Sequence, residues 1–130
     1  MARIIAIEDS PALQRLLALT MRGTEIEIES YLLGLSGLEA AIENPPELII
    51  LDLGLPDVPG WEVLERLRSE PATVDVPILV ATGETRSVVV NRLSELGAVM
   101  LEKPFTGAVL RATVRVLIGA GANAEVGSPA

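Results

Sequence analysis

Five polar residues in the sequence could act together in one reaction, and each follows a short apolar run. They are Glu8, Asp9, Asp52, Thr82 and Lys103. Three carboxylates brought to one place would repel one another, and a divalent cation would relieve that repulsion. Mg²⁺ typically binds one or two carboxylates, keeps several waters and accepts a phosphate oxygen. A lysine adds a positive point charge and a threonine adds a hydroxyl, so the set is typical of a phosphoryl-transfer site.

Asp52 is the candidate acceptor of a phosphoryl group, because a carboxylate can form an aspartyl phosphate. A loop rich in glycine and proline follows it at residues 54–60, and we expect this loop to leave the Asp52 carboxylate accessible. A bound cation and Lys103 would spread the negative charge of the transferring group.

The pattern around these residues predicts five units of a strand followed by a helix. The predicted strands cover residues 4–7, 26–29, 48–51, 77–81 and 98–101, and the predicted helices cover about 11–22, 38–42, 61–70, 88–96 and 106–118. Gly34 and Gly37 are expected to bracket a turn. Apolar strands of this kind are typical of a parallel sheet with helices on both faces. Since ligands of such sheets sit beyond the carboxyl ends of the strands, the five polar residues should meet there.

Composition excludes several classes of function. The chain has no Cys and no His, which removes disulfides, thiolate nucleophiles, Ser-His-Asp catalysis and His-ligated metals. Ten basic residues against 18 acidic ones give a net charge of −8, which disfavours binding to nucleic acid or to an anionic membrane surface. No apolar run reaches the roughly 20 residues of a membrane span, so a cytoplasmic location is expected.

The length of 130 residues indicates one domain. We expect that domain to cover residues 1–118. Residues 119–130 are rich in Gly, Ala and Ser and are expected to form a flexible tail or the start of a linker.

The ordered set of motifs resembles the receiver domain of two-component response regulators. The resemblance is carried by Glu8-Asp9, Leu51-Asp52-Leu53-Gly54-Leu55-Pro56 with Gly60, Thr82-Gly83 and Lys103-Pro104-Phe105, over residues 3 to about 118. It implies a flavodoxin-like α/β fold, a five-stranded parallel sheet of order 2-1-3-4-5 with helices on both faces. It also implies a phosphoprotein of signal transduction that is not an enzyme, although it can catalyse its own phosphorylation and dephosphorylation. Its partner would be a histidine kinase or a phosphotransfer protein.

The resemblance implies a role for each acidic residue. Asp52 would accept the phosphoryl group from a phosphohistidine. Asp9, Asp52 and the carbonyl of Gly54 would bind Mg²⁺ directly, and Glu8 would act partly through water. Gly54 stands where a larger residue is often found, so we expect easier access to the phosphoryl group and faster hydrolysis of the acyl phosphate.

The resemblance also implies how the site would act as a switch. Lys103 would contact the phosphoryl group, and its bond to Pro104 would be cis, which an X-Pro bond permits. Thr82 would move to hydrogen-bond a phosphoryl oxygen and so bias a two-state surface. Met100 stands where the family usually has Tyr or Phe. In the family the threonine is coupled to the rotation of this aromatic ring, and methionine is flexible but has no ring to rotate.

Two other functions stay open at this point. A pseudo-receiver would be a binding module whose state is not set by phosphorylation, and Met100 and Gly54 are compatible with it. A small Mg²⁺-dependent phosphohydrolase would need a substrate pocket or a lid, and the short loops argue against that.

The last two predicted helices carry more apolar surface than one covered face requires. Leu110, Val114 and Leu117 form one stripe of the last helix, and Val109, Ala112 and Val116 form a second one. Residues 88–90 similarly place valines on more than one side of the preceding helix. We therefore hypothesise that these two helices bury a partner surface, such as a second copy of the domain in a homodimer. Tight packing within a small domain is the alternative.

Overall fold

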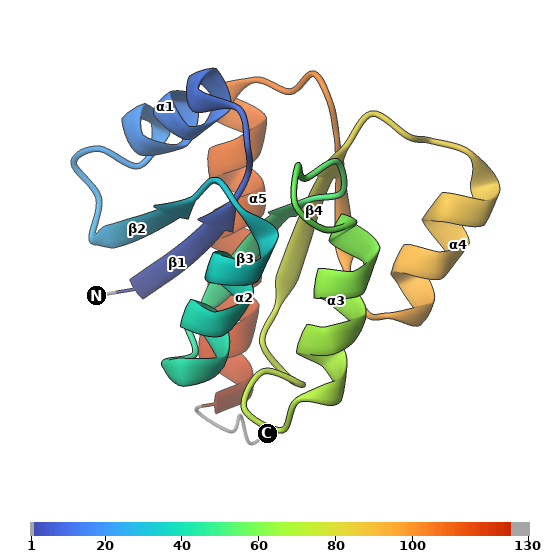
Figure 1. Cartoon of the computed structure of the whole chain (residues 1–130). Coiled ribbons are helices and arrows are strands. Elements are labelled where there is room, and N and C mark those ends of the chain that lie inside the picture. Colours follow the sequence, from blue (N-terminus) through green and yellow to red (C-terminus); the bar gives the residue numbers. More distant parts are fainter. Residues whose placement is uncertain (1, 126–130) are drawn as a thin grey trace.

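A computed structural model describes residues 2–125 of the chain, and its side chains as far as Gly119. Strands and helices alternate along the chain (Figure 1). The strands are β1 (Ala2–Ile7), β2 (Ile26–Tyr31), β3 (Leu48–Asp52), β4 (Ile78–Thr82) and β5 (Val99–Glu102), and the helices are α1 (Pro11–Thr20), α2 (Gly34–Glu43), α3 (Gly60–Ser69), α4 (Ser87–Glu95) and α5 (Gly107–Glu125). All strands pair in parallel in the order β2-β1-β3-β4-β5, which confirms the predicted sheet.

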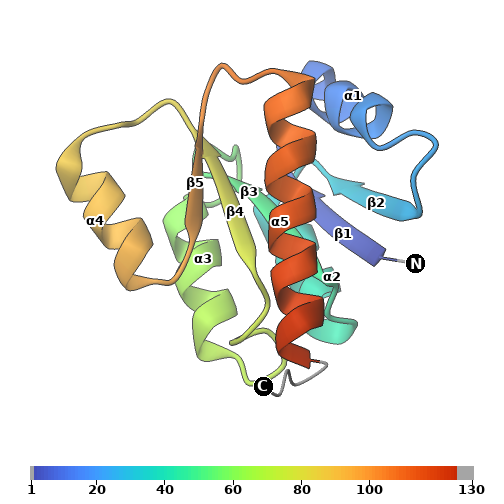
Figure 2. The ribbon, with the colours of Figure 1, turned by 180° about the vertical axis from the view of Figure 1, so that it is seen from behind.

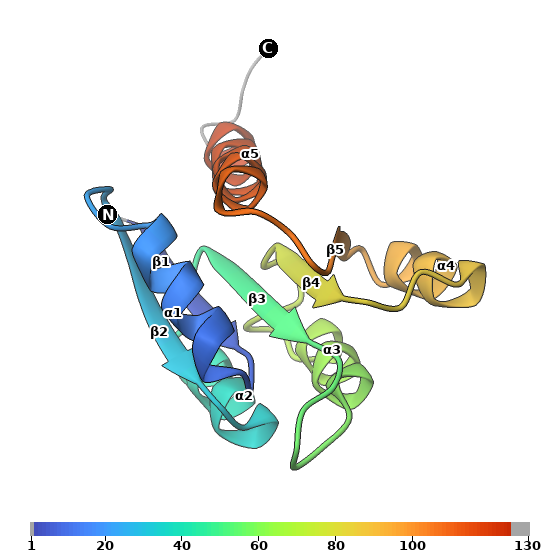
Figure 3. The same ribbon diagram turned by 90° about the horizontal axis from the view of Figure 1, so that it is seen from above.

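The sheet is covered on both faces, as its apolar strands predicted. Helices α1 and α5 lie on one face, and α2 and α3 lie on the other (Figures 2 and 3). Alternate residues of β1 divide between the two cores, since Ile4 and Ala6 pack with α1 and α5, whereas Ile5 and Ile7 pack with α2, α3 and α4. Every residue of the central strands β3 and β4 is buried. A sheet covered in this way presents only the ends of its strands to a ligand.

Helix α1 begins directly behind the acidic turn. The hydroxyl of Ser10 accepts a hydrogen bond from the N–H of Leu13 at 3.2 Å, and Pro11 occupies the first turn, as expected for a helix start. After the helix, Gly23 has a φ of 80°, which a glycine adopts without strain. The cap fixes where the helix starts relative to Glu8 and Asp9.

The turn predicted between Gly34 and Gly37 is wrong, because α2 already begins at Gly34. The carboxylate of Asp57 accepts hydrogen bonds from the N–H groups of Gly34 (2.8 Å) and Leu35 (3.0 Å) and so caps the helix from a distant loop. These bonds hold the pKa of Asp57 below its usual range. Gly37 brings α2 close to β1, since a Cβ there would lie 2.5 Å from Cγ1 of Ile7. Both glycines therefore serve helix packing rather than a turn.

Helix α5 continues to Glu125 instead of ending near Ile118. Three alanines in residues 120–124 favour a helix, because alanine has the highest helix propensity. Residues 126–130 of the predicted tail lie outside the described part of the chain, and the domain boundary at residue 118 stays a prediction. Within residues 2–125, no helix combines the length and the hydropathy needed to cross a membrane.

Candidate functional site

Three carboxylates converge at the carboxyl ends of β1 and β3. Glu8 and Asp9 follow β1, Asp52 ends β3, and one carboxylate oxygen from each lies within 4.8 Å of the other two. Glu8 and Asp52 are buried, with exposed fractions of 2% and 7%, whereas Asp9 is exposed. The structure therefore brings together the three acidic residues that the sequence placed at one edge of the sheet.

Lys103 directs its ammonium group into this cluster. Its Nζ lies 3.1 Å from Oε1 of Glu8 and 3.2 Å from Oδ1 of Asp52. The loop after β5 is fixed by a hydrogen bond from the N–H of Lys103 to the carbonyl of Thr82 at 2.9 Å. The peptide bond between Lys103 and Pro104 is cis, as the family resemblance implied.

The charges of the cluster do not balance. Burial and the neighbouring Asp52 raise the pKa of Glu8, although Lys103 and the N–H of Ser10 act in the opposite direction. Burial lowers the pKa of Lys103, but Glu8 and Asp52 outweigh it and the net pKa is raised. Three carboxylates against one ammonium leave a negative cup lined by hard oxygen ligands. Such a donor set fits Mg²⁺ and offers nothing to a soft metal.

Thr82 ends β4 beside the cluster. It is 5% exposed, and the preceding Ala81 is paired with Asp52 across the sheet. Its hydroxyl accepts a hydrogen bond from the N–H of Glu84 at 3.0 Å, and within residues 2–125 it makes none to Asp52. The threonine is therefore adjacent to the candidate acceptor but engaged with its own loop.

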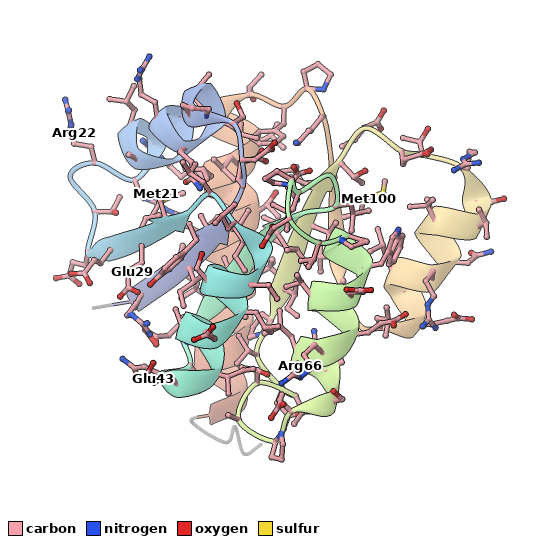
Figure 4. All side chains as sticks on the ribbon, in the orientation of Figure 1. Met21, Arg22, Glu29, Glu43, Arg66 and Met100 are labelled. Atoms are coloured by element: carbon pink, nitrogen blue, oxygen red, sulfur yellow. The ribbon has the colours of Figure 1, made fainter. Side chains whose placement is uncertain are left out.

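Met100 lies on β5, the strand next to β4 and two residues before Glu102, which pairs with Thr82. Met100 is paired with Val80 and packs, partly buried, against the core on the side of α2, α3 and α4 (Figure 4). Methionine is flexible and can fill this space in several conformations. Position 100 thus carries an adaptable side chain where the family usually has an aromatic ring, on the strand next to the one that carries Thr82.

Gly60 closes the loop that follows Asp52. Its N–H donates to the carbonyl of Leu53 at 2.9 Å, and a Cβ on Gly60 would lie 2.4 Å from both the Asp52 carbonyl oxygen and the Cα of Leu53. Any side chain there would displace the backbone of Asp52. This close approach gives a physical reason for the glycine that the family resemblance included.

One residue at this edge was not identified from the sequence. The carboxamide of Gln14 donates towards the carbonyls of Ala6, Glu8 and Tyr31 at 3.0–3.3 Å. A signal was present, because Gln14 is a polar residue directly after Leu13 and three positions before Leu17, on the side of the helix that was predicted to be apolar. Its acceptors are backbone groups of two strands, which residue types and spacing do not reveal.

The sequence matches a known family over most of its length. Residues 4–115 match the model of the response regulator receiver domain. The chain is 34% identical over 120 residues to the DNA-binding dual master transcriptional regulator RpaA of Synechocystis, a match that covers 91% of this chain and 49% of that protein. The chain therefore spans about half the length of this relative.

Solved structures have the same fold. The chemotaxis protein CheY4 of Vibrio cholerae superposes with a TM-score of 0.82 at 27% identity, covering 90% of this chain and 98% of that one. The receiver domain of the sensor histidine kinase PA1611 from Pseudomonas aeruginosa, solved with a magnesium ion in its active-site cleft, superposes with a TM-score of 0.81 at 23% identity, covering 91% and 98%. These likenesses agree with the fold of the chain, a five-stranded parallel sheet covered by helices.

Proposed function

The chain belongs to the response regulator receiver family of two-component systems, and from that membership we propose that it is a phosphoacceptor domain whose Asp52 takes a phosphoryl group in the presence of Mg²⁺. Receiver domains are signalling domains that interact with histidine kinases or phosphotransfer proteins. The proposed donor is therefore a phosphohistidine of such a partner. Phosphorylation would change the surface that the domain offers to other proteins.

The observation that carries this proposal is the position of Lys103 relative to Asp52. A separation of 3.2 Å between Nζ and Oδ1 leaves the ammonium beside any phosphoryl group attached to Asp52. Glu8 holds the same ammonium from the other side at 3.1 Å, so the lysine cannot leave the cup without losing two charged hydrogen bonds.

The proposed reaction is an in-line displacement at phosphorus. An oxygen of the Asp52 carboxylate forms a bond to phosphorus while the bond from phosphorus to the histidine nitrogen of the donor breaks, and the freed imidazole takes a proton from water. Lys103 neutralises part of the charge on the phosphoryl oxygens. Thr82 gives up its bond to the N–H of Glu84 and turns its hydroxyl towards the phosphoryl group.

Asp9, Asp52 and the carbonyl of Gly54 are the residues that we propose to hold Mg²⁺, with Glu8 acting partly through water. The cluster of three carboxylates within 4.8 Å and its excess negative charge support this assignment. When bound, the ion would supply positive charge that lowers the repulsion between the Asp52 carboxylate and an incoming phosphoryl group. Because Asp9 is exposed, its side chain can adjust to the ion with little cost to the fold.

Phosphorylation can be tested by intact mass. The protein and its Asp52→Asn variant are incubated with Mg²⁺ and a small acyl-phosphate donor. A phosphoryl adduct on the wild type alone supports the proposal. A folded wild type without an adduct supports the pseudo-receiver alternative, which the absence of a ring at Met100 favours. Continuous turnover of many phosphate substrates would instead indicate a phosphohydrolase.

A second copy of the domain is the partner that we propose for the face formed by α4, β5 and α5. Strand β5 is the edge of the sheet and lies between the two helices (Figures 2 and 3). Valines are exposed on all three elements, namely Val88, Val99, Val109 and Val116 at 65%, 40%, 48% and 68%. Leu110 and Val114 of the first predicted stripe are fully buried, whereas Val109 and Val116 of the second stripe are exposed on this face.

Light scattering with and without a phosphoryl analogue tests the homodimer. A mass that doubles on addition of the analogue supports it, and a monomer under both conditions refutes it. The excess of acidic residues leads us to propose no nucleic-acid partner for this domain.

A further inference from the structure

Gln14 is a partly buried polar residue that the proposed reaction does not use. Its Nε2 lies 3.2 Å from the carbonyl oxygen of Ala6, 3.0 Å from that of Glu8 and 3.3 Å from that of Tyr31. Its Oε1 is buried and has no hydrogen-bond partner among the described residues. The contribution of this side chain to the fold therefore comes from its N–H groups.

The three carbonyls surround the point where the pairing of β1 with β2 ends. The N–H of Glu8 donates to the carbonyl of Tyr31 at 3.0 Å and forms the outermost backbone bond between the two strands. Beyond it the chain leaves the sheet and enters the acidic turn. Gln14 reaches back from α1 to this point, and within residues 2–119 no other side chain bonds a carbonyl of residues 6–9. Its carboxamide thus joins the helix, the strand pair and the turn.

The bond to the Glu8 carbonyl bears directly on Asp9. That carbonyl belongs to the peptide group that links Glu8 to Asp9, so its direction sets the direction in which the Asp9 side chain leaves the backbone. The Glu8 carboxylate has its own anchors, the N–H of Ser10 at 3.1 Å and Lys103. The Asp9 carboxylate is exposed and has no hydrogen bond from the described residues, so only its backbone can position it.

We infer that Gln14 is a positioning residue for the metal site, acting through the Glu8–Asp9 peptide to hold Asp9 within reach of the ion that Asp52 binds. The inference rests on the proposed function, because it requires that the carboxylates bind Mg²⁺. It adds a residue of α1 to a site that is otherwise built from the ends of strands and the loops that follow them. Residues that orient metal ligands typically contribute about 10- to 100-fold to metal affinity.

The test compares the Mg²⁺ affinity of variants that remove a contact at either end of α1. Gln14→Met removes the donors at nearly constant length, whereas Gln14→Arg keeps donors for all three carbonyls and has no acceptor to leave unpaired. Arg111→Met is the matched control, because Arg111 donates to the carbonyl of Thr20 at 3.2 and 2.8 Å and so ties the opposite end of the helix. Titration with MgCl₂, followed by the amide shifts of Asp9, Asp52 and Gly54 in NMR spectra, gives the dissociation constant for folded protein.

We expect Gln14→Met to bind Mg²⁺ about tenfold more weakly, and we expect Gln14→Arg and Arg111→Met to bind it like the wild type. If Gln14→Met does not fold, Gln14→Asn takes its place, since the shorter amide cannot reach all three carbonyls. Wild-type affinity in the folded variant, or an equal loss in Arg111→Met, overturns the inference and leaves the proposed function intact. A wild type that does not bind Mg²⁺ overturns both.

Discussion

A Cβ atom on Gly54 would lie 3.9 Å from Oδ2 of Asp52 and would meet no other group at shorter range. The position therefore faces the carboxylate that we propose to be phosphorylated, and glycine leaves that side of it uncovered. The backbone of Gly54 is not in the left-handed region, so other residues can occupy the position without strain. This makes Gly54 a site at which access of water to the phosphorylated aspartate can be varied separately from the fold.

We expect the phosphorylated forms of Gly54→Ala and Gly54→Asn to live longer than that of the wild type. A side chain would exclude water from the acyl phosphate, and a few-fold slower hydrolysis corresponds to about 1 kcal/mol of activation free energy. The decay of the phosphoryl adduct, followed by intact mass after removal of the donor, measures the lifetime. Gly83→Ala is the control, since a Cβ on Gly83 meets nothing within 4 Å. Unchanged lifetimes in both Gly54 variants would contradict the prediction.

Glu8→Gln should raise the melting temperature in the absence of Mg²⁺ by a few degrees. Burial and Asp52 raise the pKa of Glu8, which means that the folded protein disfavours the charged carboxylate even with Lys103 beside it. A neutral amide of the same shape removes that cost. Differential scanning calorimetry of both proteins without the metal measures the difference, and the exposed Glu43→Gln serves as a control that should change little (Figure 4).

The pH dependence of this difference has a definite sign. Because the pKa of Glu8 is higher in the folded than in the unfolded state, protonation stabilises the wild type as the pH falls through the folded pKa towards the ordinary pKa of a glutamate. The advantage of Glu8→Gln should therefore be largest near neutral pH and shrink on acidification. An advantage that grows as the pH falls would show that Glu8 is favoured in its charged form.

The sheet and the cluster of acidic residues could be predicted because they depend on short-range patterns. Apolar runs marked the strands, and parallel strands place their carboxyl ends at one edge, so Glu8 and Asp52 could be placed at the same edge of the sheet. The strand order itself came from the family resemblance. The cap of α2 could not be predicted, since Asp57 lies 23 residues from Gly34 and acts only after folding. The contacts of Gln14 could not be predicted either, because its partners are backbone carbonyls that come together only after folding.

Mg²⁺ should raise the melting temperature of the wild type, and Asp9→Asn should lose most of that rise. A ligand that binds only the folded state stabilises it by about 2.7 kcal/mol at 100 times its dissociation constant. Asp9 is exposed, so the substitution should leave the metal-free protein almost as stable as before. Thermal unfolding at increasing MgCl₂ measures the effect. Glu102 is another exposed carboxylate near the same edge, so Glu102→Gln controls for general charge screening. If Mg²⁺ raises the melting temperature of Asp9→Asn as much as that of the wild type, Asp9 is not part of the metal site.

Arg68 ties together two loops at the end of the sheet away from the candidate site. Its guanidinium donates to the carbonyls of Val76 and Leu96 at 2.7 Å, and to those of Val74 and Gly97 at 3.1 and 3.2 Å. Burial lowers the pKa of Arg68. All four of these acceptors are neutral backbone carbonyls, so these contacts hold the guanidinium by hydrogen bonds and not by an ion pair. Arg68 of α3 thereby fixes the loop that leads into β4 and the loop that follows α4.

Arg68→Met should lower the free energy of unfolding by about 2–3 kcal/mol, because several carbonyls lose a charged donor in a partly buried place. Arg66→Met is the matched control two residues away, since that side chain is 57% exposed and, among the side chains of residues 2–119, forms an ion pair only with Glu70, a contact worth about 0.3–0.5 kcal/mol (Figure 4). Urea unfolding of both variants measures the difference. Equal losses would mean that the network around Arg68 adds no more to stability than a surface ion pair.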